Sequence, residues 1–145
     1  MRFGVVIAVM GGLLATATVA TAEQIGALLT GYEESPAVST TGRGEFIATL
    51  DGEVILYTET FSGLQGTVTQ SHIHVGQLGV NGSVVIFLCQ TAANVIAGAT
   101  TSQQLEAGDL AAVLTAIRAG AAYANVHTNL SPGGEIRGQI RTSAK

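Results

Sequence analysis

The sequence predicts an all-β domain, a Greek-key β-sandwich or barrel of about seven or eight antiparallel strands with one short helix near residues 109–119. From residue 25 onwards, short runs rich in β-branched and aromatic residues alternate with Gly, Pro, Asn and Asp, as in a succession of strands and turns. One segment, "DLAAVLTAIRAG", has instead the apolar spacing of an amphipathic helix.

Residues 1–22 have the composition of a secretory signal peptide. A basic second residue is followed by an apolar run over residues 3–14 and by the small tripeptide Ala20-Thr21-Ala22, as in such a leader. The apolar run is shorter than the roughly 20 residues of a transmembrane helix, although an uncleaved membrane anchor is the alternative. We therefore expect cleavage before Glu23 and one domain, with a single core, over residues 23–145 of a secreted or periplasmic protein.

The charge of the chain restricts its partners. Six basic residues stand against ten acidic residues, and removal of residues 1–22, which contain one arginine and no acidic residue, leaves a net charge of −5. Nucleic acid and anionic membrane surfaces are poor partners for such a protein. We expect an extracytoplasmic protein or a small ligand as the partner, and no membrane association after cleavage.

Cys89 is the only cysteine, so the chain has no intramolecular disulfide to stabilise it outside the cytoplasm. Because it lies in the apolar run "GSVVIFLCQ", we interpret it as a buried thiol. Intermolecular pairing and metal ligation are the alternatives.

The first strands are predicted by alternation and turn chemistry. A strand over residues 25–31 opens the domain, and "GEFIATL" and "EVILYTETF" then flank Asp51-Gly52, a dipeptide that favours a tight two-residue hairpin. Alternation places one face of this hairpin in the core. Every second residue of a strand shares a face. In the first strand this set is Phe46, Ala48 and Leu50, and in the second strand it is Ile55, Tyr57, Glu59 and Phe61.

The second half of the chain contains "QSHIHVG", "GSVVIFLC", a stretch over residues 90–108 without a clear period, and the helix. Asp109 is a suitable N-cap and Gly120 a suitable stop for that helix, which we expect to cover an open end or edge of the sheets. The last strands are "AAYANVHT" and "GEIRGQIRT", with Pro132 and Gly133 at the centre of a type II turn between them.

His72 and His74 are separated by one residue in the strand "QSHIHVG", and the third and last histidine of the chain is His127. Side chains i and i+2 of a strand share a face, with backbones about 6.6 Å apart, so two imidazoles so placed can converge on one ion. The same alternation puts His127 on one face with Tyr123 and Asn125. Because apolar residues occupy the positions between, we expect all three histidines on the outer, polar face of the sheet.

Three histidines with one open coordination position suit zinc or copper. We therefore predict that His72, His74 and His127 bind one copper or zinc ion, provided that the strand order brings His127 beside the other two. The alternative is that the three histidines are simply solvated.

Glu135, Arg137 and Asn125 are predicted to support the site from outside its ligand set. Glu135 and Arg137 share a face of "GEIRGQ", which returns beside His127, so that Glu135 can orient the His127 imidazole as a hydrogen-bond acceptor. A surface ion pair between Glu135 and Arg137 is the alternative. Glu34, in "GYEESPAVST", has two interpretations: a carboxylate that ligates a cation or pairs with Arg137, and a solvated loop residue.

The segments "SHIHVGQLGVNGSVV", "YANVHT" and "PGGEIRGQI", in this order and with "GYEESPAV" ahead of them, resemble the chordin-type domain family, CHRD. The similarity runs from about residue 25 to residue 140, and the combination of motifs is specific although each is weak alone. It implies an extracytoplasmic all-β domain, found singly in secreted microbial proteins and repeated in the animal developmental antagonist chordin. It implies no established reaction. The histidines, Glu135 and Arg137 occupy the family's motif positions, and Glu34 matches its opening segment.

The favoured interpretation is a secreted or periplasmic binding or interaction module that holds one metal ion, with no catalytic residue assigned. The alternative is a mononuclear copper or zinc metalloenzyme with superoxide-dismutase-like or hydrolytic activity. A structural matrix or adhesion domain is a third possibility. A two-metal superoxide dismutase is excluded because it needs more histidines and a cysteine pair. The sequence has no G-x-S-x-G, Gly-rich phosphate loop or C-x-x-C, so hydrolase-elbow, nucleotide and redox-dithiol functions lack support.

Overall fold

The computed structural model describes residues 22–52, 54–89, 97–100 and 109–143. These residues form one 3₁₀ turn, η1 (Gly31–Glu33), one helix, α1 (Leu110–Arg118), and nine strands: β1 (Glu23–Thr30), β2 (Arg43–Asp51), β3 (Val54–Ser62), β4 (Val68–Val75), β5 (Ser83–Cys89), β6 (Ala97–Thr100), β7 (Ala122–Thr128), β8 (Ile136–Gln139) and β9 (Arg141–Thr142). Every strand pair is antiparallel, which confirms the predicted all-β class.

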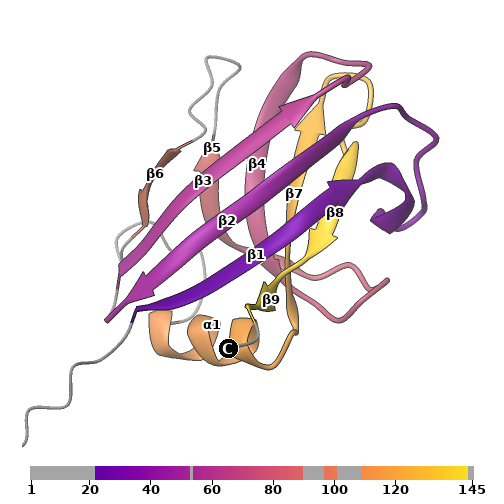
Figure 1. Cartoon of the computed structure of the whole chain (residues 1–145). Helices are drawn as coiled ribbons and strands as arrows, with labels where there is room; N and C mark the ends of the chain where they lie inside the picture. Colours follow the sequence, from indigo (N-terminus) through magenta and orange to yellow (C-terminus); the bar gives the residue numbers. More distant parts are fainter. Residues whose placement is uncertain (1–21, 53, 90–96, 101–108, 144–145) are drawn as a thin grey trace, which may run out of the picture.

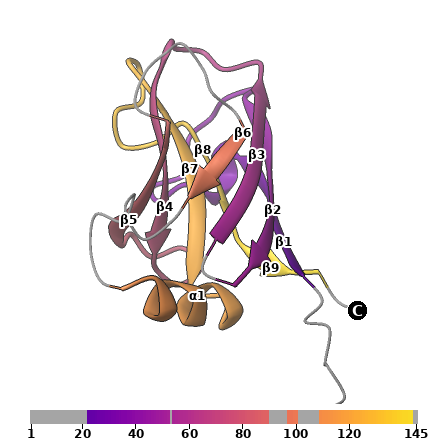
Figure 2. The ribbon, with the colours of Figure 1, turned by 90° about the vertical axis from the view of Figure 1, so that its left-hand side faces the viewer.

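The strands make one sheet in the order β5-β4-β7-β8-β1-β2-β3-β6, with β9 added beside β1. The sheet curls until the layer of β1, β2 and β3 faces the layer of β5, β4 and β7, and β8 joins the two layers (Figures 1 and 2). Four of the neighbouring pairs, β4 with β7, β8 with β1, β3 with β6 and β9 with β1, are not consecutive along the chain. The result is the sandwich-like half-barrel that the pattern of short strands predicts.

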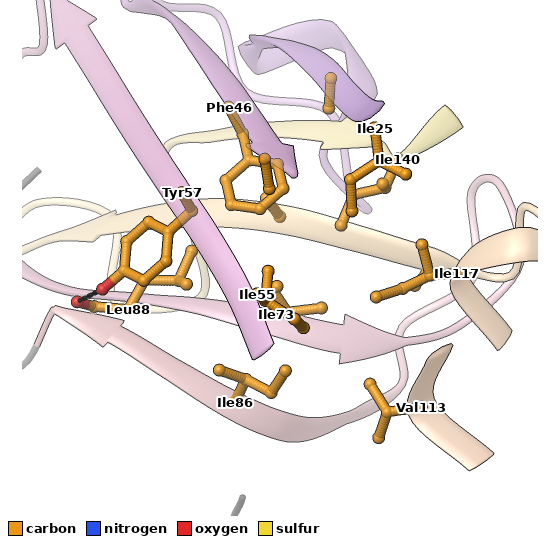
Figure 3. Close-up of a cluster of buried hydrophobic side chains, with 14 of the residues drawn as sticks. Ile25, Phe46, Ile55, Tyr57, Ile73, Ile86, Leu88, Val113, Ile117 and Ile140 are labelled. Carbon is orange, nitrogen blue, oxygen red and sulfur yellow. Dashed lines mark hydrogen bonds between the residues drawn. The ribbon is translucent and has the colours of Figure 1, made fainter. Parts of the chain in front are cut away.

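The hydrophobic core lies between the two layers (Figure 3). Alternation supplies it, because every second residue of each strand faces inward. Tyr57 spans the space between the layers, where its hydroxyl donates a 2.8 Å hydrogen bond to the carbonyl oxygen of Leu88. Fully buried aliphatic side chains fill the remainder, among them Ile25, Leu29, Ile55, Ile73, Ile86, Ile117, Ile136 and Ile140.

The hairpin of β2 and β3 is confirmed, with a small change in its turn. Asp51 pairs with Val54 and is the last residue of β2, so the turn begins at Gly52 and not at Asp51. Gly52 has φ 59°, the left-handed conformation that glycine adopts at low cost. Phe46 and Tyr57 stack in the core, as the predicted alternation requires.

The helix is also confirmed. The side chain of Asp109 caps it by accepting a 2.9 Å hydrogen bond from the Ala112 amide, and Gly120 follows its last turn with φ 67°. Its apolar stripe, Leu110, Val113, Leu114 and Ile117, is buried, and the helix lies across one end of the two layers (Figure 2). It therefore covers an open end of the half-barrel, as expected.

Other predictions need correction or lie outside the described residues. β6 lies within residues 90–108, where the sequence shows no clear period and predicts no strand. Pro132 and Gly133 are the central residues of a turn closed by a 3.0 Å hydrogen bond from the Gly134 amide to the Ser131 carbonyl oxygen. The positive φ belongs to Gly134, however, so the turn is not of type II.

The proposed signal peptide and the side chain of Cys89 lie outside the described part of the structure.

Candidate metal site

The three histidines meet because β4 pairs with β7. In this ladder His72 lies opposite Asn125, and His127 lies opposite Gln70, two residues before His72. The imidazole centroid of His72 is 4.7 Å from that of His127 and 5.3 Å from that of His74, and the His74 and His127 centroids are 6.2 Å apart. The strand order thus brings residue 127 beside the histidine pair.

All three imidazoles project from the face of the sheet that points away from the core, since Ile73, Ala124 and Val126 occupy the inner face. This face is nevertheless not solvated here. The histidines retain only 3% (His72), 7% (His74) and 6% (His127) of their exposure. Two connections lie over them: residues 76–82, between β4 and β5, and residues 129–135, between β7 and β8. The alternative of solvated histidines is therefore wrong.

Both connections hold the rings through backbone carbonyl groups. Nδ1 of His74 lies 2.9 Å from the Gly82 carbonyl oxygen, and Nδ1 of His127 lies 2.8 Å from that of Pro132. A carbonyl oxygen only accepts, so each Nδ1 carries the hydrogen and each neutral ring presents the Nε2 lone pair to the cluster. Histidines that bind metals are commonly anchored in this way, because the second hydrogen bond fixes both tautomer and ring orientation.

The separations of the ring nitrogens suit a shared ion. One ligand nitrogen from each histidine lies within 4.8 Å of the others, and Nδ1 of His72 is 3.1 Å from Nε2 of His127. Two donors bound to one ion at about 2.0–2.1 Å, with an angle of about 90–110° between them, lie about 2.9–3.4 Å apart. Nε2 of His74 is buried without a hydrogen-bond partner, which is rare for a buried nitrogen and leaves its lone pair available to an ion.

Burial also keeps the rings neutral. It lowers the pKa of His72 to about 3, with the neighbouring His127 and His74 contributing further. Burial lowers the pKa of His74 and of His127 as well, although the hydrogen bonds to the carbonyl groups of Gly82 and Pro132 oppose it. A metal binds the neutral imidazole, so the cluster has its lone pairs available at ordinary pH.

Arg137 and Tyr123 support one side of the cluster. The Tyr123 ring stacks on His74 with centroids 4.7 Å apart, and Cζ of Arg137 lies 3.4 Å from the Tyr123 centroid. The guanidinium is 1% exposed and donates to the carbonyl oxygens of Gln77 and Val80 and to Oδ1 of Asn81. Arg137 thus fastens the 76–82 connection over the histidines.

Glu135 does not take either of its predicted roles. Its carboxylate accepts hydrogen bonds from the hydroxyls of Thr40 and Thr128 and from the amides of Gln65 and Gly66. The ladder between β7 and β8 ends at Val126 and Ile136, so Glu135 lies beyond it and turns toward Thr128 rather than His127. Burial raises its pKa, but the four hydrogen bonds outweigh burial and lower it. In the described part of the chain the ion pair that forms is Arg118 with Glu23.

The surroundings of Glu34 differ most from those that the sequence predicts. It is not a solvated loop residue: its side chain is 7% exposed and Oε1 has no hydrogen-bond partner. Burial raises its pKa to about 7, against the charge of Arg137 and a hydrogen bond with the side chain of Asn125. Pro36, two residues on, was the local signal of a fixed conformation, but nothing local showed what would cover the carboxylate.

The fold and the cluster define an antiparallel β domain with three histidines buried on the outer face of its sheet. The CHRD domain family matches residues 25–140, and the chain belongs to that family. No curated protein and no solved structure matches the chain. Within the described residues, no helix combines the length and apolar character needed to cross a membrane.

Proposed function

We propose that this CHRD domain is an extracytoplasmic binding module that holds one copper or zinc ion through His72, His74 and His127. One observation carries the proposal: three buried, neutral imidazoles converge, and two of them are anchored through Nδ1 so that Nε2 faces the common centre. Imidazole ligands suit zinc and copper, whereas calcium and magnesium prefer oxygen.

The extracytoplasmic location rests on two independent features. CHRD domains are typically extracellular. Residues 1–22 also have the composition of a secretory leader, and β1 begins at Glu23, the residue after the expected cleavage site. We expect the secreted or periplasmic domain to recognise an extracytoplasmic protein or a small ligand.

A catalytic metal is the second candidate, because three protein ligands leave one position of a tetrahedral ion free for water or substrate. Exposures of 3–7% at the three histidines argue for ion binding over turnover, since a substrate needs a path to the ion. The two cavities described, of about 500 and 510 Å³, lie elsewhere, against β1, β2 and β3 and against β1, β2 and β9.

Metal analysis of the purified protein after incubation with Zn²⁺ or Cu²⁺ tests the proposal. We expect one ion per chain and a rise in thermal stability, because an ion bound to the folded state at 100 times its Kd adds about 2.7 kcal/mol to the free energy of unfolding. Each of His72→Ala, His74→Ala and His127→Ala is expected to lose stoichiometric binding, whereas Thr69→Ala, an exposed position of the same strand, is expected to keep it. A wild-type protein that stays metal-free, with an unchanged melting temperature, contradicts the proposal.

A further inference from the structure

Asn125 occupies the centre of the histidine cluster. It lies on β7 between Tyr123 and His127, is 2% exposed, and its Oδ1 is 3.0 Å from Nε2 of His127. Asn125 also lies opposite His72 in the ladder of β4 and β7, so its amide is placed next to two of the three histidines.

In the contact between Asn125 and His127, two hydrogen-bond acceptors face each other. Nδ1 of His127 donates to the Pro132 carbonyl oxygen, so the neutral ring has no hydrogen on Nε2. Oδ1 of an amide has none either, and two acceptors at 3.0 Å repel one another unless a positively charged group lies between them. A cation at this point relieves the repulsion.

Glu34 explains why the amide oxygen, and not the nitrogen, points at the imidazole. Nδ2 of Asn125 and Oε1 of Glu34 both lie beside Gly134, so the amide nitrogen faces Glu34 while the amide oxygen faces His127. Gly134 makes this arrangement possible. A Cβ at that position would lie 2.8 Å from Nδ2 of Asn125 and would collide with Oε1 of Glu34.

We propose that Oδ1 of Asn125 is the fourth donor of the three-histidine site, oriented by Glu34, so that the site is closed. The inference rests on the metal-binding function proposed above. The contacts of 3.0 and 3.1 Å that Nε2 of His127 makes with Asn125 and His72 both fall in the range of about 2.9–3.4 Å expected between donors of one ion. Four protein ligands are the mark of a site that stores or is stabilised by its metal, whereas catalytic sites keep a position open.

Azide binding to the Cu²⁺-loaded protein tests the closed site. Azide coordinates an open position of Cu²⁺ and produces a charge-transfer band in the visible spectrum. We expect the wild type to show no such band and Asn125→Ala to show it, with copper retained but bound at least 10- to 100-fold more weakly, the loss typical for a partner outside the ligand set. Asn125→Asp, which keeps an oxygen donor, is expected to exclude azide again. Gln70→Ala, which removes a half-buried amide opposite His127, is the matched control and should behave as the wild type.

The role of Glu34 is tested by the pair Glu34→Gln and Glu34→Leu. A glutamine oxygen can still accept from the Asn125 amide and should keep azide out, whereas leucine removes the acceptor and should admit azide. An azide charge-transfer band in the Cu²⁺-loaded wild type overturns the proposal, and this result does not depend on whether a variant folds. A wild type that binds no copper in the same experiment refutes the metal site itself, which is a different and separately visible failure.

Discussion

Glu59 is expected to make the protein less stable as the pH rises from about 4.5 to 7. Its side chain is 1% exposed on the inner face of β3, beside the core residues Ile55 and Tyr57. One oxygen accepts a 2.5 Å hydrogen bond from the Ser71 hydroxyl, and the other has no partner. Burial raises the pKa of Glu59 from 4.5 to about 7, and the Ser71 hydrogen bond opposes the shift only in part.

The sign follows from proton binding. Between the pKa of the unfolded chain and that of the folded protein, the folded state binds more protons, so the free energy of unfolding falls as the pH rises and levels off above about 7. Each pKa unit corresponds to 1.36 kcal/mol, so the shift from 4.5 to about 7 amounts to about 3 kcal/mol. Glu34, whose pKa burial also raises to about 7, contributes a slope of the same sign.

Urea unfolding of the wild type and of Glu59→Gln at several pH values between 4.5 and 8 measures this effect. The glutamine variant is expected to lose the Glu59 part of the slope and to be more stable than the wild type by up to about 3 kcal/mol at pH 8. Glu45→Gln, on the exposed face of β2, should leave the slope unchanged. Parallel pH profiles for wild type and Glu59→Gln, or a wild type that gains stability over this range, would refute the reasoning.

Three further substitutions test separate contacts. Gly134→Ala places a Cβ against Oε1 of Glu34 at a residue with φ 121°, and should cost about 1–3 kcal/mol of stability in urea; equal stability of variant and wild type would show that Glu34 does not fill this space. Asp109→Ala removes the N-cap of α1 and should lower the free energy of unfolding by about 1 kcal/mol, whereas an unchanged value would mean that the cap contributes nothing. Arg137→Lys loses the planar donor set that holds the 76–82 connection, and should speed hydrogen exchange of the Gly82 amide; exchange at the wild-type rate would remove the guanidinium from this role.

Alternation along single strands could be predicted well, because a slip of one residue would exchange the inner and outer faces. Ile73 between two histidines, and Val126 before the third, sufficed to place all three imidazoles on the outer face. The helix was equally predictable, since its apolar spacing, the Asp109 cap and the Gly120 stop are local features. The motifs that resemble CHRD domains lie within residues 25–140, the range that the family matches, and they indicate the family without any knowledge of the fold.

What the sequence could not show depends on contacts between distant segments. Strand order has no local signal, so the pairing of β4 with β7 remained a condition of the predicted site. The burial of Glu34 depends on Asn125 and Gly134, about 90–100 residues further along the chain, and the partners of Glu135 depend on where one ladder ends. Glu59 stands at an inward position of an ordinary strand, and only the assembled core reveals how unusual its carboxylate is.

The central claim, that three neutral imidazoles share one ion, is tested most directly by ¹⁵N NMR of the histidine side chains during titration with Zn²⁺. Before metal is added, the spectra should show neutral rings at pH 6–7, with His74 and His127 protonated on Nδ1, because burial lowers the pKa of every histidine and Nδ1 of these two faces a carbonyl group. Saturation at one equivalent should shift a ring nitrogen of all three histidines together, with Nε2 as the responding atom in His74 and His127. Rings that titrate near their ordinary pKa, or that keep their ¹⁵N frequencies through several equivalents of Zn²⁺, would contradict the account.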